Sequence, residues 1–68
     1  MTYASINFRT KKAFREAVER GEVVTLYEPG LGRAPTDGRA WVEGPWYPEP
    51  HRWYAQVEVA EGRVVKVR

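Results

Sequence analysis

The chain has 68 residues and no cysteine, which excludes disulfide bonds and thiolate metal sites. A single histidine argues against a zinc site built from protein ligands, and no apolar run reaches the roughly 18 residues that a membrane-spanning helix needs. The formal net charge is only +2, but both ends of the chain are basic, which permits polyanion binding without requiring it.

Length and composition predict a single small domain over residues 1–68, with no metal and no cofactor. Domains of this size bury only about 60% of their unfolded surface, so they often gain stability by association. We therefore expect a homodimer as one possibility. No secretory signal is visible at the N-terminus, so we expect a cytoplasmic protein, and the scarcity of Asn, Gln, Met and Cys is typical of thermophiles.

A helix is predicted from about residue 11 to residue 20, after an extended arm at residues 3–8. Thr10 is its N-cap, because the hydroxyl can accept from a first-turn N–H group, and Gly21 is the natural residue after its last turn. One apolar stripe recurs at helical spacing and faces a core: Ala13, Phe14, Ala17 and Val18.

The start of this helix is basic, although the helix dipole favours acidic residues there. Free N–H groups together with Arg9, Lys11 and Lys12 predict a site for phosphate or another anion. The alternative interpretation is a solvated charged face that costs a few tenths of a kcal/mol.

Four strands are predicted after the helix, at about residues 23–27, 39–43, 52–59 and 64–68. The fold class is therefore α+β, with one helix packed on a four-stranded, mainly antiparallel sheet. The arm at residues 3–8 could add a further edge.

The last hairpin can be assigned a register. A two-residue turn at Glu61 and Gly62 would mix apolar and polar residues on each face. A three-residue loop over residues 60–62 instead pairs Val57 with Val65 and keeps the faces separate. We therefore predict the three-residue loop.

Strand alternation turns three aromatic residues away from the helix, among several cations. Single-stranded nucleic acid needs this combination, because bases stack on rings while cations contact phosphates. The predicted nucleic-acid or partner surface comprises Tyr27, Arg39, Trp41, Tyr54, Lys66 and Arg68, with Trp46 and Tyr47 beside it. The alternative is a protein-interaction module or homodimer that uses the same aromatic face as an interface.

Residues 44–55 are rich in proline and aromatic side chains and form the most unusual stretch of the chain. Prolines fix their own φ angles and favour extended geometry in the residues before them. We expect a stiff crossover that delivers Trp53 to the core. Trp46, Tyr47 and His51 then either cap the outer side of the sheet or extend the stacking surface.

Catalysis finds little support in the sequence. His51 is the one conventional general base near neutral pH, with Glu49 two residues away and Glu43 nearby in the predicted fold. A lone histidine beside proline and arginine is more typical of a hydrogen-bonded loop residue. The expected class is a non-enzymatic binding protein.

The run Gly-Pro-Trp-Tyr-Pro-Glu-Pro-His-Arg-Trp-Tyr-Ala resembles a segment shared by a group of small uncharacterised prokaryotic or viral proteins. The similarity extends over most of residues 7–68, including the helix and the last strand. The resemblance implies a complete stand-alone protein, and it assigns no catalytic or binding residue.

Overall fold

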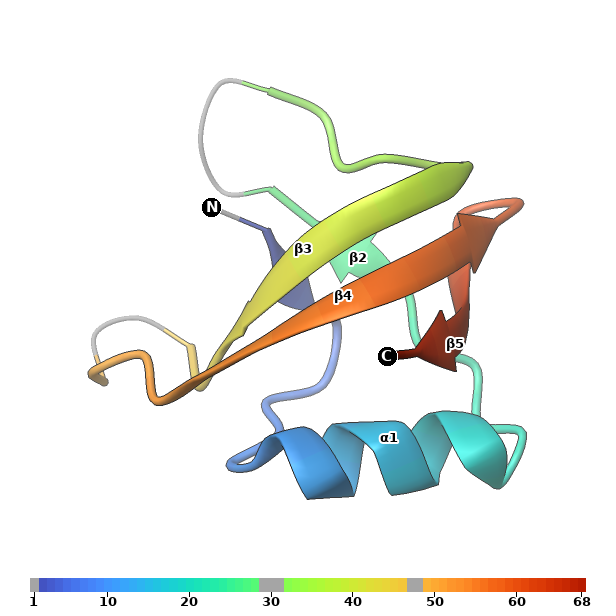
Figure 1. Ribbon diagram of the computed structural model, residues 1–68. Coiled ribbons are helices and arrows are strands. Elements are labelled where there is room, and N and C mark those ends of the chain that lie inside the picture. The colour runs from blue at the N-terminus through green and yellow to red at the C-terminus, as the bar shows by residue number, and fades with distance from the viewer. Residues whose placement is uncertain (1, 29–31, 47–48) are drawn as a thin grey trace.

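The computed structural model describes residues 2–28, 32–46 and 49–68, and this part of the chain holds one helix and five strands. The strands form a sheet in the order β2-β1-β3-β4-β5, and the helix packs along one side of it (Figure 1). In chain order the elements are β1 (Tyr3–Ala4), α1 (Lys11–Glu19), β2 (Leu26–Tyr27), β3 (Gly38–Gly44), β4 (Trp53–Ala60) and β5 (Arg63–Val67). The predicted α+β class is confirmed.

The sheet differs from the predicted four-stranded, mainly antiparallel one, because β1 makes it five-stranded and mixed. This strand lies inside the sheet, antiparallel to β2 and parallel to β3. Tyr3 is opposite Tyr27 on one side and opposite Glu43 on the other. A two-residue strand is too short to show alternation, so local pattern alone could not place it.

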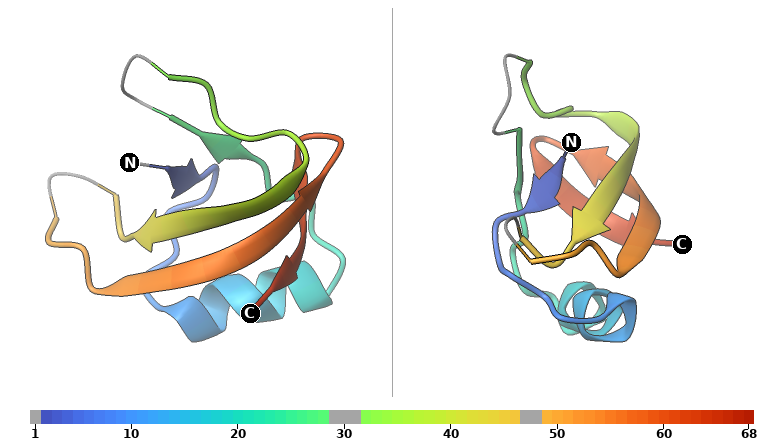
Figure 2. Two further views of the ribbon diagram at one scale, coloured as in Figure 1. Left: turned by 45° about the horizontal axis from the view of Figure 1, so that its top comes forward. Right: turned by 90° about the vertical axis from the view of Figure 1, so that its left-hand side faces the viewer.

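The sheet curls until its two edges meet. Thr25, just before β2, forms a bridge with Arg63 at the start of β5, and the Val64 amide donates to the Val24 carbonyl at 2.8 Å. On its other side, the Thr25 carbonyl accepts from the Ser5 amide at 2.8 Å. The strands therefore wrap around a central core, with α1 along one side (Figure 2).

Helix α1 begins where the capping residue predicts. The Thr10 hydroxyl accepts from the Ala13 amide at 3.1 Å, and Gly21 follows the last turn with a φ of 88°. Phe14 and Ala17 are fully buried on the apolar stripe. The Phe14 ring lies 5.2 Å from the ring of Phe8 and 5.4 Å from that of Trp53, so α1 is joined to the sheet through aromatic contacts.

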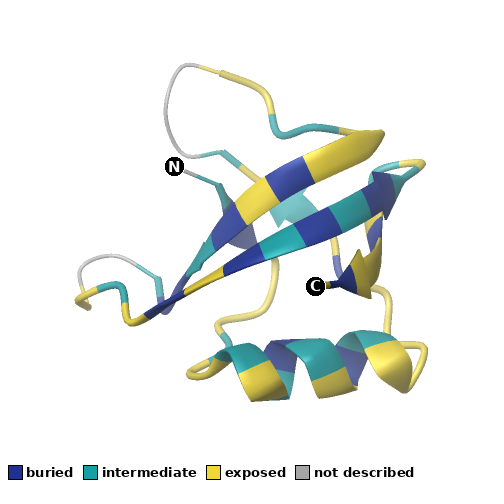
Figure 3. Cartoon of the chain, viewed as in Figure 1, coloured by how far each residue is buried: buried dark blue, intermediate teal, exposed yellow. Residues whose placement is uncertain are grey.

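Strands β3 and β4 alternate between buried and more exposed residues along their length (Figure 3). Their inward side chains, including Val42, Ala55 and Val57, fill the core beside Phe14. Trp53 enters this core as predicted, and its indole N–H donates to the Phe8 carbonyl at 3.1 Å.

The predicted register of the last hairpin was wrong. Ala60 pairs with Arg63, so the turn has two residues, and Val57 pairs with Val67 rather than with Val65. A β-bulge in the β4–β5 pairing shifts the register between Glu58 and Val59 and restores an apolar inner face. A two-residue turn would place apolar and polar residues on the same face only if the ladder had no bulge, and the prediction assumed such a ladder.

Candidate nucleic-acid interface

The outer face is the side of β3 and β4 that points away from the core. It presents six side chains, which are Arg39, Trp41 and Glu43 from β3 and Tyr54, Gln56 and Glu58 from β4. Their neighbours in sequence are buried, since alternate residues of a strand point to opposite sides. The strand pattern thus fixes which side chains face solvent together.

Trp41 and Tyr54 are the large exposed rings of this face, with 63% and 56% of their surface exposed. Trp41 is opposite Gln56, and Tyr54 is opposite Glu43, two pairs further along the ladder. The two rings are therefore diagonal neighbours, about 7–8 Å apart at their Cα atoms. Neither ring contacts another ring in the described part of the chain, and more than half of each side chain's surface is open to a ligand.

Cations lie at one end of this aromatic pair. Glu58 is opposite Arg39 on β3 and opposite Lys66 on β5. The Arg68 guanidinium also reaches Glu58, at 2.5 Å, and its amide donates to the Gln56 carbonyl at 2.8 Å. Three cations therefore lie around Glu58, and because Glu43 lies opposite Tyr54, the face as a whole carries an excess of one positive charge.

Tyr27 shares the cross-strand row of Tyr54 but lies far from it. The row runs through Tyr27, Tyr3, Glu43 and Tyr54 across β2, β1, β3 and β4. Three strand spacings of about 4.8 Å place Tyr27 roughly 14 Å from Tyr54. Its ring, 39% exposed, lies 5.7 Å from Tyr3 and 6.0 Å from Trp46. The inserted β1 thus separates Tyr27 from the other two predicted stacking residues.

Trp46 holds the proline-rich crossover against the N-terminal segment. Its indole N–H donates to the Ala4 carbonyl at 3.0 Å, and its amide donates to the Asn7 side-chain oxygen at 2.9 Å. Both bonds join segments about forty residues apart in the chain. Of the two predictions for this residue, these contacts favour capping of the sheet. Tyr47 lies outside the described residues.

His51 belongs to the same crossover and lies over Tyr3. Its Nε2 is 2.7 Å from the Tyr3 hydroxyl, and its Nδ1 is 3.2 Å from a carboxylate oxygen of Glu43. That oxygen is buried, and in the described part of the chain its contact with His51 is an ion-pair distance without hydrogen-bond geometry. Because Tyr3 is buried, these contacts attach the crossover to the sheet. They favour a structural role for His51.

The three residues of the predicted anion site, at the start of α1, have different surroundings in the structure. The Thr10 hydroxyl already binds the Ala13 amide, while Lys11 is half-buried and Lys12 is exposed. Arg9 lines a pocket with residues of the crossover rather than the helix N-terminus alone. Sequence reasoning overlooked Arg52 in this pocket, although its position two residues before Tyr54 was a usable signal.

No protein-family model, curated protein or solved structure matches this chain. The resemblance of the proline-rich run to small prokaryotic or viral proteins therefore stays a prediction. Within the described residues, no group of three or more His, Cys, Asp or Glu side chains could hold a metal ion. Over the same residues, α1 is too short and too polar to cross a membrane.

Proposed function

We propose that this protein binds single-stranded nucleic acid through its outer face. The observation that carries the proposal is the pair of exposed, diagonal rings of Trp41 and Tyr54. Stacking on such rings contributes about 1–3 kcal/mol per base, and it tolerates any sequence because every base has a π-face. Two bases would therefore supply roughly 2–6 kcal/mol.

The neighbouring charges support the same proposal. We expect Arg39, Lys66 and Arg68 to contact the phosphates of a strand that is stacked on the rings, and Glu58 offsets one of these three cations. Gln56, opposite Trp41, places an amide with both donors and acceptors between the rings and these cations. The expected ligand is a short, unpaired strand that is bound with little sequence preference.

The alternative is an interface between copies of the chain or with another protein, and it would use the same two rings. Charged side chains are depleted in the centre of protein interfaces. Here Arg39, Glu58 and Lys66 form a charged row two residue pairs away from Trp41. This arrangement favours a polyanionic ligand over a dry interface.

The test replaces both rings in the double variant Trp41→Ala/Tyr54→Ala. Its affinity for a fluorescently labelled oligothymidylate is measured by anisotropy at low salt. Loss of two stacking platforms, at roughly 2–6 kcal/mol together, should weaken binding by at least about 30-fold. Val23→Thr/Val65→Thr is the control, because it removes two exposed apolar side chains elsewhere and should bind like the parent.

Equal affinity of the parent and the folded ring variant would contradict the proposal. If the parent and the control instead sediment as dimers and the ring variant sediments as a monomer, the interface alternative replaces the nucleic-acid proposal. Folding of each variant is checked by circular dichroism and a cooperative thermal transition.

A further inference from the structure

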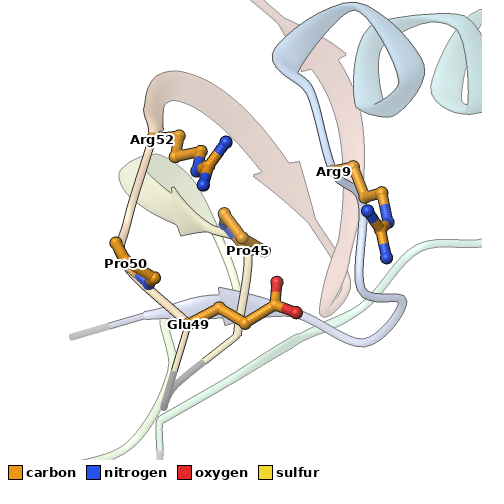
Figure 4. Close-up of a pocket in the computed structure, with 5 residues that line it drawn as sticks. All are labelled: Arg9, Pro45, Glu49, Pro50 and Arg52. Atoms are coloured by element: carbon orange, nitrogen blue, oxygen red, sulfur yellow. The ribbon is translucent and has the colours of Figure 1, made fainter.

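A pocket of about 240 Å³ lies between the segment that leads into α1 and the crossover after β3. It is lined by Arg9, Pro45, Glu49, Pro50 and Arg52 (Figure 4). Figure 4 shows the three charged side chains arranged around the Pro45 ring, and the two arginines come from opposite sides of the pocket.

The three charged side chains of this pocket are exposed, and they are unpaired among the described residues. In the described part of the chain, neither guanidinium has an ion pair or a side-chain hydrogen bond, and the same holds for the Glu49 carboxylate. Two unpaired guanidinium groups and one carboxylate leave the pocket with one excess positive charge. Guanidinium groups match phosphate oxygens in geometry and bind them through charge-assisted hydrogen bonds.

The backbone holds both arginines in place. The Arg52 amide donates to the Gly44 carbonyl at 2.7 Å, which extends the pairing of β3 and β4 to the pocket. Arg9 lies between Phe8, whose carbonyl accepts from the Trp53 indole, and Thr10, the helix cap. The backbone of both arginines is therefore positioned beside the pocket before any ligand binds, which lowers the cost of binding.

The pocket lies near the end of the outer face at which β4 begins. Arg52 immediately precedes β4, so it is two residues, or about 7 Å of extended chain, from Tyr54. Arg39, Glu58 and Lys66 lie at the opposite end of the same ladder. Cations therefore flank the aromatic pair at both ends.

We propose that Arg9 and Arg52 bind a phosphate group of the strand whose bases stack on Tyr54 and Trp41. The proposal rests on the proposed function above. The phosphate is either an internal phosphodiester or a terminal phosphate, since both present the same oxygens to the two guanidinium groups.

The test compares Arg9→Gln/Arg52→Gln with the matched control Arg15→Gln/Arg33→Gln, which removes the same two charges elsewhere. Each protein is titrated at several salt concentrations with oligothymidylate that carries a 5′-phosphate or a 5′-hydroxyl. The pocket variant should bind about 10-fold more weakly than the control, and its salt slope should be shallower by about 1.

The two oligonucleotides distinguish the sources of the phosphate. A preference of the parent for the 5′-phosphate that the pocket variant loses indicates a terminal phosphate. An equal loss for both oligonucleotides indicates an internal one. Affinity and salt slope that match those of the control would overturn the proposal.

A separate measurement distinguishes failure of the pocket from failure of the proposed function. Inorganic phosphate is titrated into the labelled parent, and the NMR resonances of the Arg9 and Arg52 backbone amides are followed. Saturable shifts that the pocket variant lacks support a phosphate site even if the parent binds no oligonucleotide. The absence of shifts, together with unchanged oligonucleotide binding by the variant, rejects the site while leaving the stacking face intact.

Discussion

Gly44 occupies a position at which the core has no room for a side chain. A Cβ atom at this position would lie 2.2 Å from Cζ2 and 2.3 Å from Cε2 of Trp53, the residue opposite it in β4. The indole cannot easily move away, because it is hydrogen-bonded to Phe8 and packed near Phe14. The Trp53 ring at the start of β4 thus occupies the space that a side chain at the end of β3 would need, and this is why β3 ends in glycine.

We expect Gly44→Ala to lower the free energy of unfolding by about 1–3 kcal/mol, as overpacking in a core does. Each kcal/mol corresponds to roughly 4–8 °C in Tm for a domain of this size, so calorimetry will detect it. Gly32→Ala is the control, because its Cβ would meet only Glu28 Cγ, at 3.8 Å. If Gly44→Ala costs as much stability in a Trp53→Phe background as in the parent, the steric explanation is wrong.

At the residue scale, much of the candidate face follows from alternation alone. Exposed Trp41 and Tyr54 could be predicted because Val42 and Ala55 beside them are plainly core residues. The surroundings of Tyr27 could not be predicted, because its ring contacts Tyr3 on the inserted strand β1. Nothing in the sequence around Tyr3 indicates that it is buried. Arg9 was predicted to bind an anion, but its place beside Arg52 was missed for a similar reason, because the two residues line one pocket only through the folded crossover.

The β4–β5 turn shows how an element adjusts to a two-residue connection. Glu61 and Gly62 have φ angles of 53° and 81°, the left-handed geometry of a type I′ turn. The preceding loop supports the turn, since the Glu61 amide donates to an Asp37 side-chain oxygen at 3.2 Å and the Gly62 amide to the Thr36 carbonyl at 2.9 Å. Glutamate is a poor residue for this backbone, whereas asparagine is favoured.

Glu61→Asn should therefore raise the free energy of unfolding by about 0.5–1 kcal/mol, because strain in the turn is relieved. Thermal unfolding of the parent, of this variant and of Glu61→Ala provides the comparison. The alanine variant removes the same carboxylate without favouring positive φ, so it should not be stabilised. Equal Tm values for the alanine and asparagine variants would show that the gain is not conformational.

The elements differ in how far local pattern predicts them. Helix α1 was predicted to within a residue, because Thr10 and Gly21 mark its ends and Phe14 marks its buried side. Strands β3 and β4 alternate long enough to be recognised. β1 has two residues, and its pairing with β2 and β3 joins distant segments. The β4–β5 bulge was likewise invisible, because a bulge changes register without changing composition.

For the molecule as a whole, the distribution of charge separates the two proposed roles of the outer face. Glu58 lies among Arg39, Lys66 and Arg68, where it would repel a phosphate backbone and where it holds one of the cations. A nucleic-acid surface should gain affinity when this carboxylate is neutralised. An apolar interface between proteins should respond little.

Glu58→Gln is expected to tighten oligothymidylate binding about 2–5-fold at low salt and to steepen the salt slope by roughly 0.7, the contribution of one more phosphate contact. The matched control is Glu19→Gln, which changes charge equally on the exposed side of α1. Anisotropy titrations between low and moderate salt measure both quantities. Identical curves for the two variants would argue against phosphate contacts beside Glu58.

The bridge between Thr25 and Arg63 has a consequence for how copies of this protein can meet. Open sheets expose a row of unpaired backbone groups, onto which a second chain can add a strand and start an aggregate. Here the strands at the two margins of the sheet are short, and the bridge joins them to each other. Such closure disfavours growth by strand addition, so any assembly in solution would have to form through side chains.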